Sequence, residues 1–485
     1  MNVLLVTLDQ FRGDCLSAAG HPVVRTPHLD ALAADGVRLA RHHAQAAPCA
    51  PGRASLYTGT YQMNHRVVAN GTPLDDRFDN VARVARRAGY RPTLFGYTDV
   101  GLDPRRAEGP DDPRLSHYDG VLPGFDVELD LPDHHEPWLA WLVEQGHDPL
   151  RSAHRALATE PDRPSEHGVS AFLTDRLLAW IDRQDGPWFA HASYLRPHPP
   201  FAAAGAWSRR YAPDDVDLPI PPADDRHPFH DAMLGAPAAA APTDEGELRR
   251  LRAQYYGMVS DVDHQLGRVR AALEAAGQWD DTLVIVTSDH GEYLGDHGFI
   301  QKHGYFGVSY HVPGIVRDPR HPVAHGTVVD AFTESVDIVP TICDAIGLDV
   351  PAQCDGLPLT PFLRAEAPPW WRTAAHWEYD WRSTFIAADP HPWPWDRRLE
   401  RQHLATLRTD DAAYVQFGDG TWVAFDLAAD PTWRTLLHDT DRALALAQEM
   451  LVWRSTHAER THTDFLLVDG GVGRWPPDTD RLRGG

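Results

Sequence analysis

The sequence is poor in cysteine and lacks long apolar runs. Its 485 residues include four cysteines, Cys15, Cys49, Cys343 and Cys354, and none forms a Cys-x-x-Cys pair. Four are too few for a disulfide framework and fit a cytoplasmic protein. No stretch reaches the roughly 18 apolar residues of a membrane span, and the N-terminal apolar run is too short for a signal peptide. We therefore expect a soluble cytoplasmic protein with no membrane partner.

Positive charge is scarce relative to negative charge. Lys and Arg total 45 against 69 Asp and Glu, which gives a formal net charge of −24 at pH 7. This balance argues against a nucleic-acid partner and against anionic membranes. A small anionic substrate remains compatible with it, because a site can be locally positive within an acidic protein. Shares of 42% apolar and 24% charged residues also argue against disordered and fibrous folds.

Two short apolar segments, residues 3–8 and 283–286, are typical of buried strands in a parallel sheet. A helix is expected after Thr26, and a long amphipathic helix over residues 248–273. Asp9 and Asp289 each follow one of the two strands directly. Because ligands bind at the carboxyl ends of strands in open α/β sheets, we expect both carboxylates in one cleft. The expected fold is an α/β/α sandwich around a large, mostly parallel sheet.

The chain is expected to divide near residue 360. Residues 1–360 would form the catalytic domain, with insertions near 103–137 and 201–245 that are rich in Pro, Asp and Ala. Ten of the sixteen tryptophans lie between Trp370 and Trp475. Residues 361–485 are therefore expected to form a smaller C-terminal subdomain, which contains a short antiparallel sheet and offers oligomer contacts.

The most specific local pattern begins at Cys49. Cys49, Pro51 and Arg53 form a Cys-x-Pro-x-Arg sequence, which is followed by Thr58 and Gly59. This pattern resembles the sulfatase signature, in which the cysteine is oxidised after translation to formylglycine, whose hydrated aldehyde is the nucleophile. Taken alone, the same residues would also fit a buried structural cysteine ahead of a loop proline.

Further motifs extend the resemblance over almost the whole chain, at residues 64–66, 95–98, 103–105, 194–201, 288–302, 379–382 and 453–454. Together they are similar to the phosphonate monoester hydrolases, a branch of the alkaline phosphatase superfamily close to the sulfatases. The resemblance implies an alkaline phosphatase-like fold and cleavage of phosphonate monoesters and phosphodiesters, with promiscuous sulfate monoester hydrolysis. It also implies a small anionic ester substrate, a formylglycine-generating enzyme as maturation partner, and a homotetramer.

The resemblance also assigns the site residues. One divalent metal ion, Mn²⁺ or Ca²⁺, would be held by Asp9, Gln10, Cys49, Asp289 and His290. Cys49, Arg53, His198 and Lys302 would be catalytic, and Asn70 and Tyr97 would lie around the transferring group. His198 would be the general acid, because an unperturbed histidine has a pKa near neutrality. Arg53 and Lys302 would offset charge on the transferring oxygens.

The donor types agree with this assignment. Asp9, Asp289 and His290 form a mostly oxygen set that suits a hard divalent cation. A thiolate is a soft ligand and fits poorly there, whereas the oxygen of a hydrated aldehyde fits well. Structural alternatives remain for three residues: His198 is one of 28 histidines, Lys302 can be a solvated surface lysine, and Asn70 can cap a turn before Gly71.

Asp99 departs from the family pattern, which usually has a threonine there. A carboxylate in the pocket would repel a dianion, by about 1 kcal/mol at 4 Å in water and by several times more in a partly buried site. We expect Asp99 to bind substrate and to favour monoanionic or amine-bearing esters. The alternatives are that Asp99 binds metal, or that it turns away and caps its loop.

Three functions are compatible with the sequence. They are a phosphonate monoester hydrolase, a sulfatase proper of the choline-sulfatase or arylsulfatase type, and a binding protein that keeps the fold without catalysis. The third is disfavoured because the nucleophile, the metal set and Arg53 are all present.

The variant Cys49→Ala separates the enzymes from the binding protein. Under either enzymatic function the variant loses its turnover of aryl esters, because no nucleophile remains. Unchanged turnover would support the binding protein instead.

Overall fold

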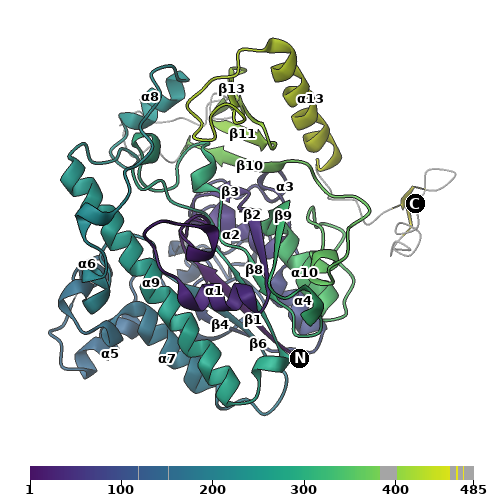
Figure 1. The fold of residues 1–485 in the computed structure, drawn as a ribbon. Helices are drawn as coiled ribbons and strands as arrows, with labels where there is room; N and C mark the ends of the chain where they lie inside the picture. Colours follow the sequence, from purple (N-terminus) through teal and green to yellow (C-terminus); the bar gives the residue numbers. More distant parts are fainter. Residues whose placement is uncertain (118, 151, 383–400, 459–465, 468–472, 475–485) are drawn as a thin grey trace.

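Two β-sheets organise the chain (Figure 1). The computed structural model describes residues 1–117, 119–150, 152–382, 401–458, 466–467 and 473–474. The larger sheet has eight strands in the order β5-β4-β6-β1-β7-β8-β2-β9. In that order they span Asp126–Asp130, Pro92–Gly96, Phe189–Tyr194, Asn2–Leu8, Thr282–Thr287, Ile315–Arg317, Val37–His43 and Thr327–Glu334. All neighbours pair in parallel except β8, which is antiparallel to β7 and to β2.

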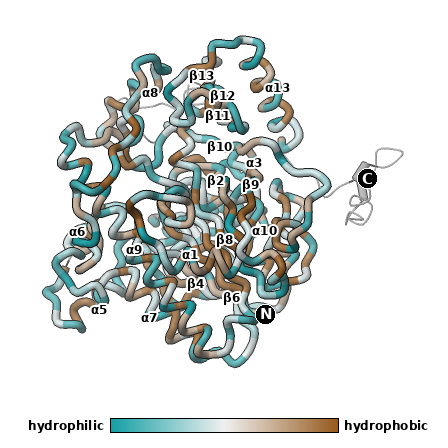
Figure 2. Tube along the Cα trace, in the orientation of Figure 1, coloured by the Kyte–Doolittle hydropathy of each residue, from teal (hydrophilic) through white to brown (hydrophobic). Residues whose placement is uncertain are grey.

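The large sheet is covered by helices on both faces. Val3 and Leu5 of β1 pack in one apolar cluster with α2 (Cys49–Thr58), α4 (Val81–Arg87) and α10 (Ile338–Ala345). Leu4, Val6 and Leu8 point the other way and pack with α1 (Pro27–Ala34), α7 (Val169–Ile181) and α9 (Glu245–Ala275). Figure 2 shows the hydrophobic residues concentrated along the central strands. This arrangement confirms the expected α/β/α sandwich around a mostly parallel sheet.

The elements expected from the sequence are present with small shifts. The strands at 3–8 and 283–286 are β1 and β7, and the long helix is α9. Helix α1 begins at Pro27 as expected, but Thr26 makes no capping hydrogen bond to its backbone. The Thr26 hydroxyl instead donates to Asp30. The remaining α-helices of the first 363 residues are α3 (Gln62–His65), α5 (Glu136–Glu144), α6 (Ala153–Ala158), α8 (Pro228–Leu234) and α11 (Thr360–Leu363).

The segment 103–137 contributes to the large sheet as well as to loops. Its residues Asp126–Asp130 form the edge strand β5, which pairs in parallel with β4. This strand has no apolar pattern in the sequence because Asp126, Glu128 and Asp130 are charged, and its Val127 is exposed. The segment 201–245 contains α8 and otherwise short turns of 3₁₀ helix.

The smaller sheet has five strands in the order β13-β12-β11-β10-β3. They span Trp422–Asp426, Ala412–Phe417, His403–Arg408, Ala375–Asp380 and Ala46–Ala47. The first four are antiparallel, whereas the two-residue β3 joins β10 in parallel and comes from the region just before Cys49. Helix α13 (Thr440–Thr456) packs on this sheet, and β14 (Leu466–Leu467) pairs with β15 (Gly473–Arg474). Of the predicted tryptophan-rich tail, Trp393, Trp395 and Trp475 lie outside the described residues.

Within the described part of the chain, no helix combines the length and the apolar character that a membrane crossing requires.

A buried ion cluster joins the two sheets. Arg372 precedes β10, and its guanidinium donates to both carboxylate oxygens of Asp337 at 2.5 and 2.7 Å. It also forms an ion pair with Glu334, at the end of β9, at 3.4 Å. All three side chains are at most 7% exposed. Asp337 is paired with Arg372, whereas Glu334 is shared between Arg372 and the ring of His376, whose Nδ1 lies 3.1 Å from it.

We expect Arg372→Met to lower the free energy of unfolding by about 3–5 kcal/mol, because it leaves the buried Asp337 without its cation and takes the guanidinium away from Glu334, whose other ion-pair partner is the ring of His376. Urea denaturation measures this change. The control is Arg442→Met, which breaks the more exposed Arg442–Asp411 pair and should cost less than about 1 kcal/mol. Equal losses in the two variants would contradict the role given to the cluster.

Candidate active site

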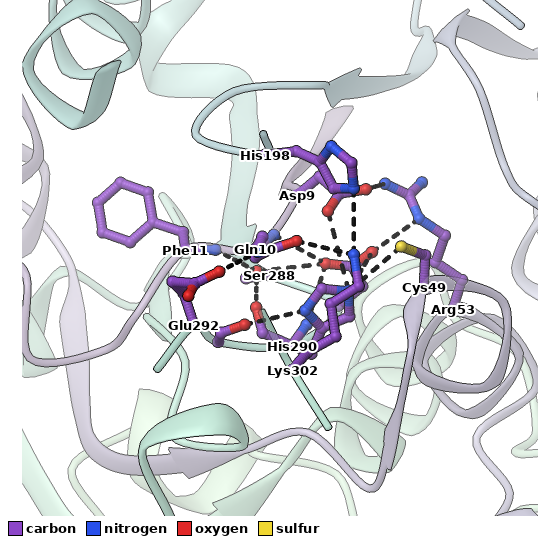
Figure 3. A network of polar contacts seen from close by, with 12 residues as sticks. Asp9, Gln10, Phe11, Cys49, Arg53, His198, Ser288, His290, Glu292 and Lys302 are labelled. Carbon is purple, nitrogen blue, oxygen red and sulfur yellow. Dashed lines mark hydrogen bonds and ion pairs between the residues drawn. The ribbon is translucent and has the colours of Figure 1, made fainter. Parts of the chain in front are cut away.

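Two neighbouring strands bring the predicted carboxylates together. Asp9 follows β1, Asp289 follows β7, and the two strands are paired in parallel, so both side chains emerge at the same sheet edge. Figure 3 shows Asp9, Cys49 and His290 converging on one point. The ligand atoms of Asp9, Cys49, Asp289 and His290 all lie within 4.8 Å of one another. Asp9 and Asp289 therefore lie close together, as their positions after neighbouring strands predict.

This cluster fits a hard divalent cation. Oδ1 of Asp9 is buried and, among the described residues, has no hydrogen-bond partner. His290 donates from Nδ1 to the Gly291 carbonyl at 3.0 Å, which leaves Nε2 facing the cluster, 3.3 Å from Sγ of Cys49. Burial and the charge of Asp9 raise the pKa of the Asp289 carboxyl. A bound cation would favour the ionised form of both carboxylates.

Arg53 is the central cation of the site and is fully buried. Its Nε donates to Asp289 at 2.9 Å, and Nη2 donates to Asp9 at 3.1 Å. Nη1 donates to the Ser193 hydroxyl at 2.7 Å and to the Tyr97 carbonyl at 3.0 Å. All of its nitrogens therefore have partners, and Arg53 fixes the two carboxylates relative to each other.

Cys49 is the first residue of α2 and is 3% exposed. Burial and the charges of Asp9, Asp99 and Asp289 raise the pKa of its thiol, against the opposing effect of Lys302. An unmodified Cys49 is therefore a neutral thiol and a poor nucleophile in this site. The helix reaches the cluster because residue 52 is glycine: a Cβ there would lie 2.4 Å from the Asp289 carbonyl oxygen.

Lys302 and His198 approach the cluster from opposite sides in Figure 3 and form a hydrogen-bonded pair there. The Lys302 ammonium donates to Oε1 of Gln10 at 2.8 Å and to Nε2 of His198 at 3.1 Å. His198 donates from Nδ1 to the Pro199 carbonyl at 2.8 Å, which fixes its tautomer. Both residues therefore lie at the site, as predicted. Lys302 is buried, with an exposed fraction of 6%, and is not a solvated surface lysine.

The protonation of His198 differs from the expectation of a pKa near neutrality. Burial and the nearby Lys302 lower the pKa of His198 to about 3, with Asp9 opposing them. The imidazole is therefore neutral, and the proton shared between the two side chains resides on Lys302.

Three other predicted residues make contacts within the protein. The Tyr97 hydroxyl donates to Asp9, and the Asn70 side chain accepts from the Ala50 backbone N–H at 3.0 Å, next to Cys49. The Gln10 amide donates to Glu292, while its oxygen faces Lys302. Substrate contact by Tyr97 and Asn70, and metal coordination by Gln10, stay predictions.

Asp99 lies three residues beyond β4, with φ at 54° and an exposed fraction of 5%. Within the described residues its carboxylate makes no hydrogen bond, so the structure shows no contact by which Asp99 would cap its loop. Burial raises the pKa of Asp99 to about 7; Asp9, Asp289 and Asp133 add to this effect and Arg53 opposes it.

Sequence reasoning gave no role to three residues that shape the site. Glu292 is buried and holds the Gln10 amide, and burial raises its pKa to about 7. The Tyr255 hydroxyl donates to the Gln10 carbonyl at 2.7 Å, and Ser193 binds Arg53. Two of these residues have a local signal in the sequence. Glu292 lies within the motif of residues 288–302, and Ser193 lies near the carboxyl end of β6.

Comparison with known proteins agrees with this geometry. The model of the family described as "Sulfatase" matches residues 1–348, and that of the "N-sulphoglucosamine sulphohydrolase, C-terminal" family matches residues 295–452. The multifunctional alkaline phosphatase superfamily protein PehA of Trinickia caryophylli is 36% identical over 510 positions, which cover 97% of this chain and 98% of that protein.

Two solved structures are similar over nearly their whole length. The phosphonate monoester hydrolase of Agrobacterium radiobacter superposes with a TM-score of 0.90 at 42% identity, over 98% of this chain and 100% of that one. The phosphonate monoester hydrolase of Silicibacter pomeroyi superposes with a TM-score of 0.89 at 35% identity, with the same coverage. The chain therefore belongs to the sulfatase family of the alkaline phosphatase superfamily.

Proposed function

We propose that this chain is a metal-dependent hydrolase of phosphonate monoesters and phosphodiesters that uses formylglycine, made from Cys49, as its nucleophile. The observation that carries the proposal is the similarity to two phosphonate monoester hydrolases over 98% of the chain. The grouping of Asp9, Cys49, Asp289 and His290 supports it independently. These substrates and sulfate monoesters are all tetrahedral monoanions, so promiscuous sulfate hydrolysis belongs to the proposal.

Asp9, Asp289 and His290 would hold the metal together with residue 49, and Gln10 would complete the set. Mn²⁺ and Ca²⁺ both suit these donors. When bound, the ion supplies positive charge that polarises an oxygen of the substrate and lowers the pKa of a hydroxyl. Formylglycine supplies two hydroxyls in its hydrated form: one for attack and a second whose deprotonation releases the product anion.

The remaining side chains would hold the metal-binding carboxylates in place and offset their negative charge. Arg53 keeps Asp9 and Asp289 in place and offsets their charge, while the Asp9 carboxylate also accepts from Tyr97. Lys302 and His198 share a hydrogen bond, so the pair holds the proton that the departing alkoxide or phenoxide needs. A homotetramer with contacts from the C-terminal subdomain completes the proposal by analogy with the family.

The substrate class is tested on one preparation that is metal-loaded and contains the aldehyde at residue 49, as mass spectrometry verifies. We expect a higher kcat/KM for a nitrophenyl phosphonate monoester than for the matching nitrophenyl sulfate. Chelation should abolish both activities, and Cys343→Ala, a buried cysteine change in α10, should leave both unchanged. A preference for the sulfate would instead identify a sulfatase proper.

The role of the proton donor is tested by comparing esters whose leaving groups differ in their need for a proton. In His198→Asn, kcat/KM should fall by roughly 100-fold or more for an ester of a poor leaving group such as phenol. It should fall by less than about tenfold for nitrophenol, which leaves with little need of a proton. A uniform loss over a series of substituted phenols would contradict this role.

A further inference from the structure

Asp99 is a carboxylate without a partner beside the catalytic cluster. Its side chain is 5% exposed and makes no hydrogen bond in the part of the chain that the structure describes. Burial of a carboxylate without a hydrogen bond or a cation is unfavourable. Its charge nevertheless acts on the cluster, because Asp99 is among the groups that raise the pKa of the Cys49 thiol, after burial and Asp9.

The cations of the site are already engaged. Arg53 donates to Asp9 and Asp289, and Lys302 donates to Gln10 and His198. Neither has a hydrogen bond to Asp99. The cluster that could hold a metal does not include Asp99 either, so a cationic group of the substrate is the partner that would balance it.

Within the described residues, Asp99 makes no hydrogen bond to the Lys302–His198 pair, whose members bind each other and, through Lys302, Gln10. The leaving oxygen would take its proton from that pair. The part of the substrate left for Asp99 is therefore the substituent that stays on phosphorus.

A cavity of about 670 Å³ lies beside the loop that carries Asp99. Gly120 lines it, and the Gly120 carbonyl accepts from the Thr98 hydroxyl at 2.9 Å and from the Val100 N–H at 3.3 Å, the residues on either side of Asp99. The lining also includes the acidic residues Asp119, Asp130 and Glu136. Asp119 binds the backbone N–H of Asp133 at 2.7 Å, and the charge of Asp133 also acts on Asp99. Arg114, which lines the cavity too, is paired with Asp112 at 2.6 Å. The loop of Asp99 thus borders a cavity whose lining holds these three acidic side chains together with His117, His134 and the paired Arg114.

Resting on the proposed function, we propose that Asp99 is a specificity-determining residue that binds an ammonium group on the substituent retained by phosphorus. The substrate class is then the monoesters of aminoalkylphosphonates. An ion pair between Asp99 and the ammonium would supply the partner that the carboxylate lacks.

The test compares two nearly isosteric substrates, the nitrophenyl esters of aminomethylphosphonate and ethylphosphonate, in the metal-loaded, aldehyde-containing enzyme. The variant is Asp99→Asn, because asparagine tolerates the left-handed backbone at φ 54° whereas a β-branched threonine does not. The control, Asp214→Asn, removes the same charge from an exposed loop position.

We expect the ratio of the two kcat/KM values, aminomethyl over ethyl, to fall about tenfold or more in Asp99→Asn. It should stay unchanged in Asp214→Asn. An unchanged ratio in Asp99→Asn, with ethylphosphonate turnover retained, would overturn the assignment of Asp99 and leave the proposed function standing.

The wild-type enzyme provides a second measurement that does not depend on the variant's folding. Unprotonated amine binds Asp99 more weakly, so the preference for the aminomethyl ester should disappear above the pKa of the substrate amine. A preference that persists there would overturn the assignment. Loss of turnover on both esters in the wild type would instead overturn the proposed function, and the assignment with it.

Discussion

The site depends on one buried guanidinium. Arg53 neutralises Asp9 and Asp289, which without it would repel each other in a place that water does not reach. The same group binds Ser193 of β6 and the carbonyl of Tyr97 beyond β4. Since Arg53 itself belongs to α2, it fixes the nucleophile helix to the ends of four strands. The geometry of the candidate metal cluster is therefore set by a charge that is not itself a ligand.

The sequence predicts those parts of the fold and of the site that a local pattern of residues encodes. Apolar runs ending in Asp9 and Asp289 predicted two strands and one shared cleft, and a period near 3.6 predicted α9. Strand β3 has two residues and β5 is mostly charged, so neither carries a periodic pattern. The hydrogen bonds of Lys302 to Gln10 and His198 join loops far apart in the chain, which no local pattern encodes.

The smaller sheet supports the site from two directions. Through β3 it holds the residues just before Cys49, and through Tyr379 of β10 it binds His303, the neighbour of Lys302, at 2.9 Å. Figure 1 shows β10 and β3 side by side above α2. The segments that carry Cys49 and Lys302 thus both rest on strands that the chain supplies after residue 370.

The pairing of β3 with β10 also bears on when Cys49 can be modified during biosynthesis. Ala46 and Ala47 are fully buried and pair with Glu378 and Tyr379, which the ribosome delivers much later. Once the sheet is complete, this peptide and the Cys49 thiol are buried. If Cys49 is converted to formylglycine as proposed, the oxidising enzyme would therefore have to act before β10 docks, or on a chain that has unfolded again.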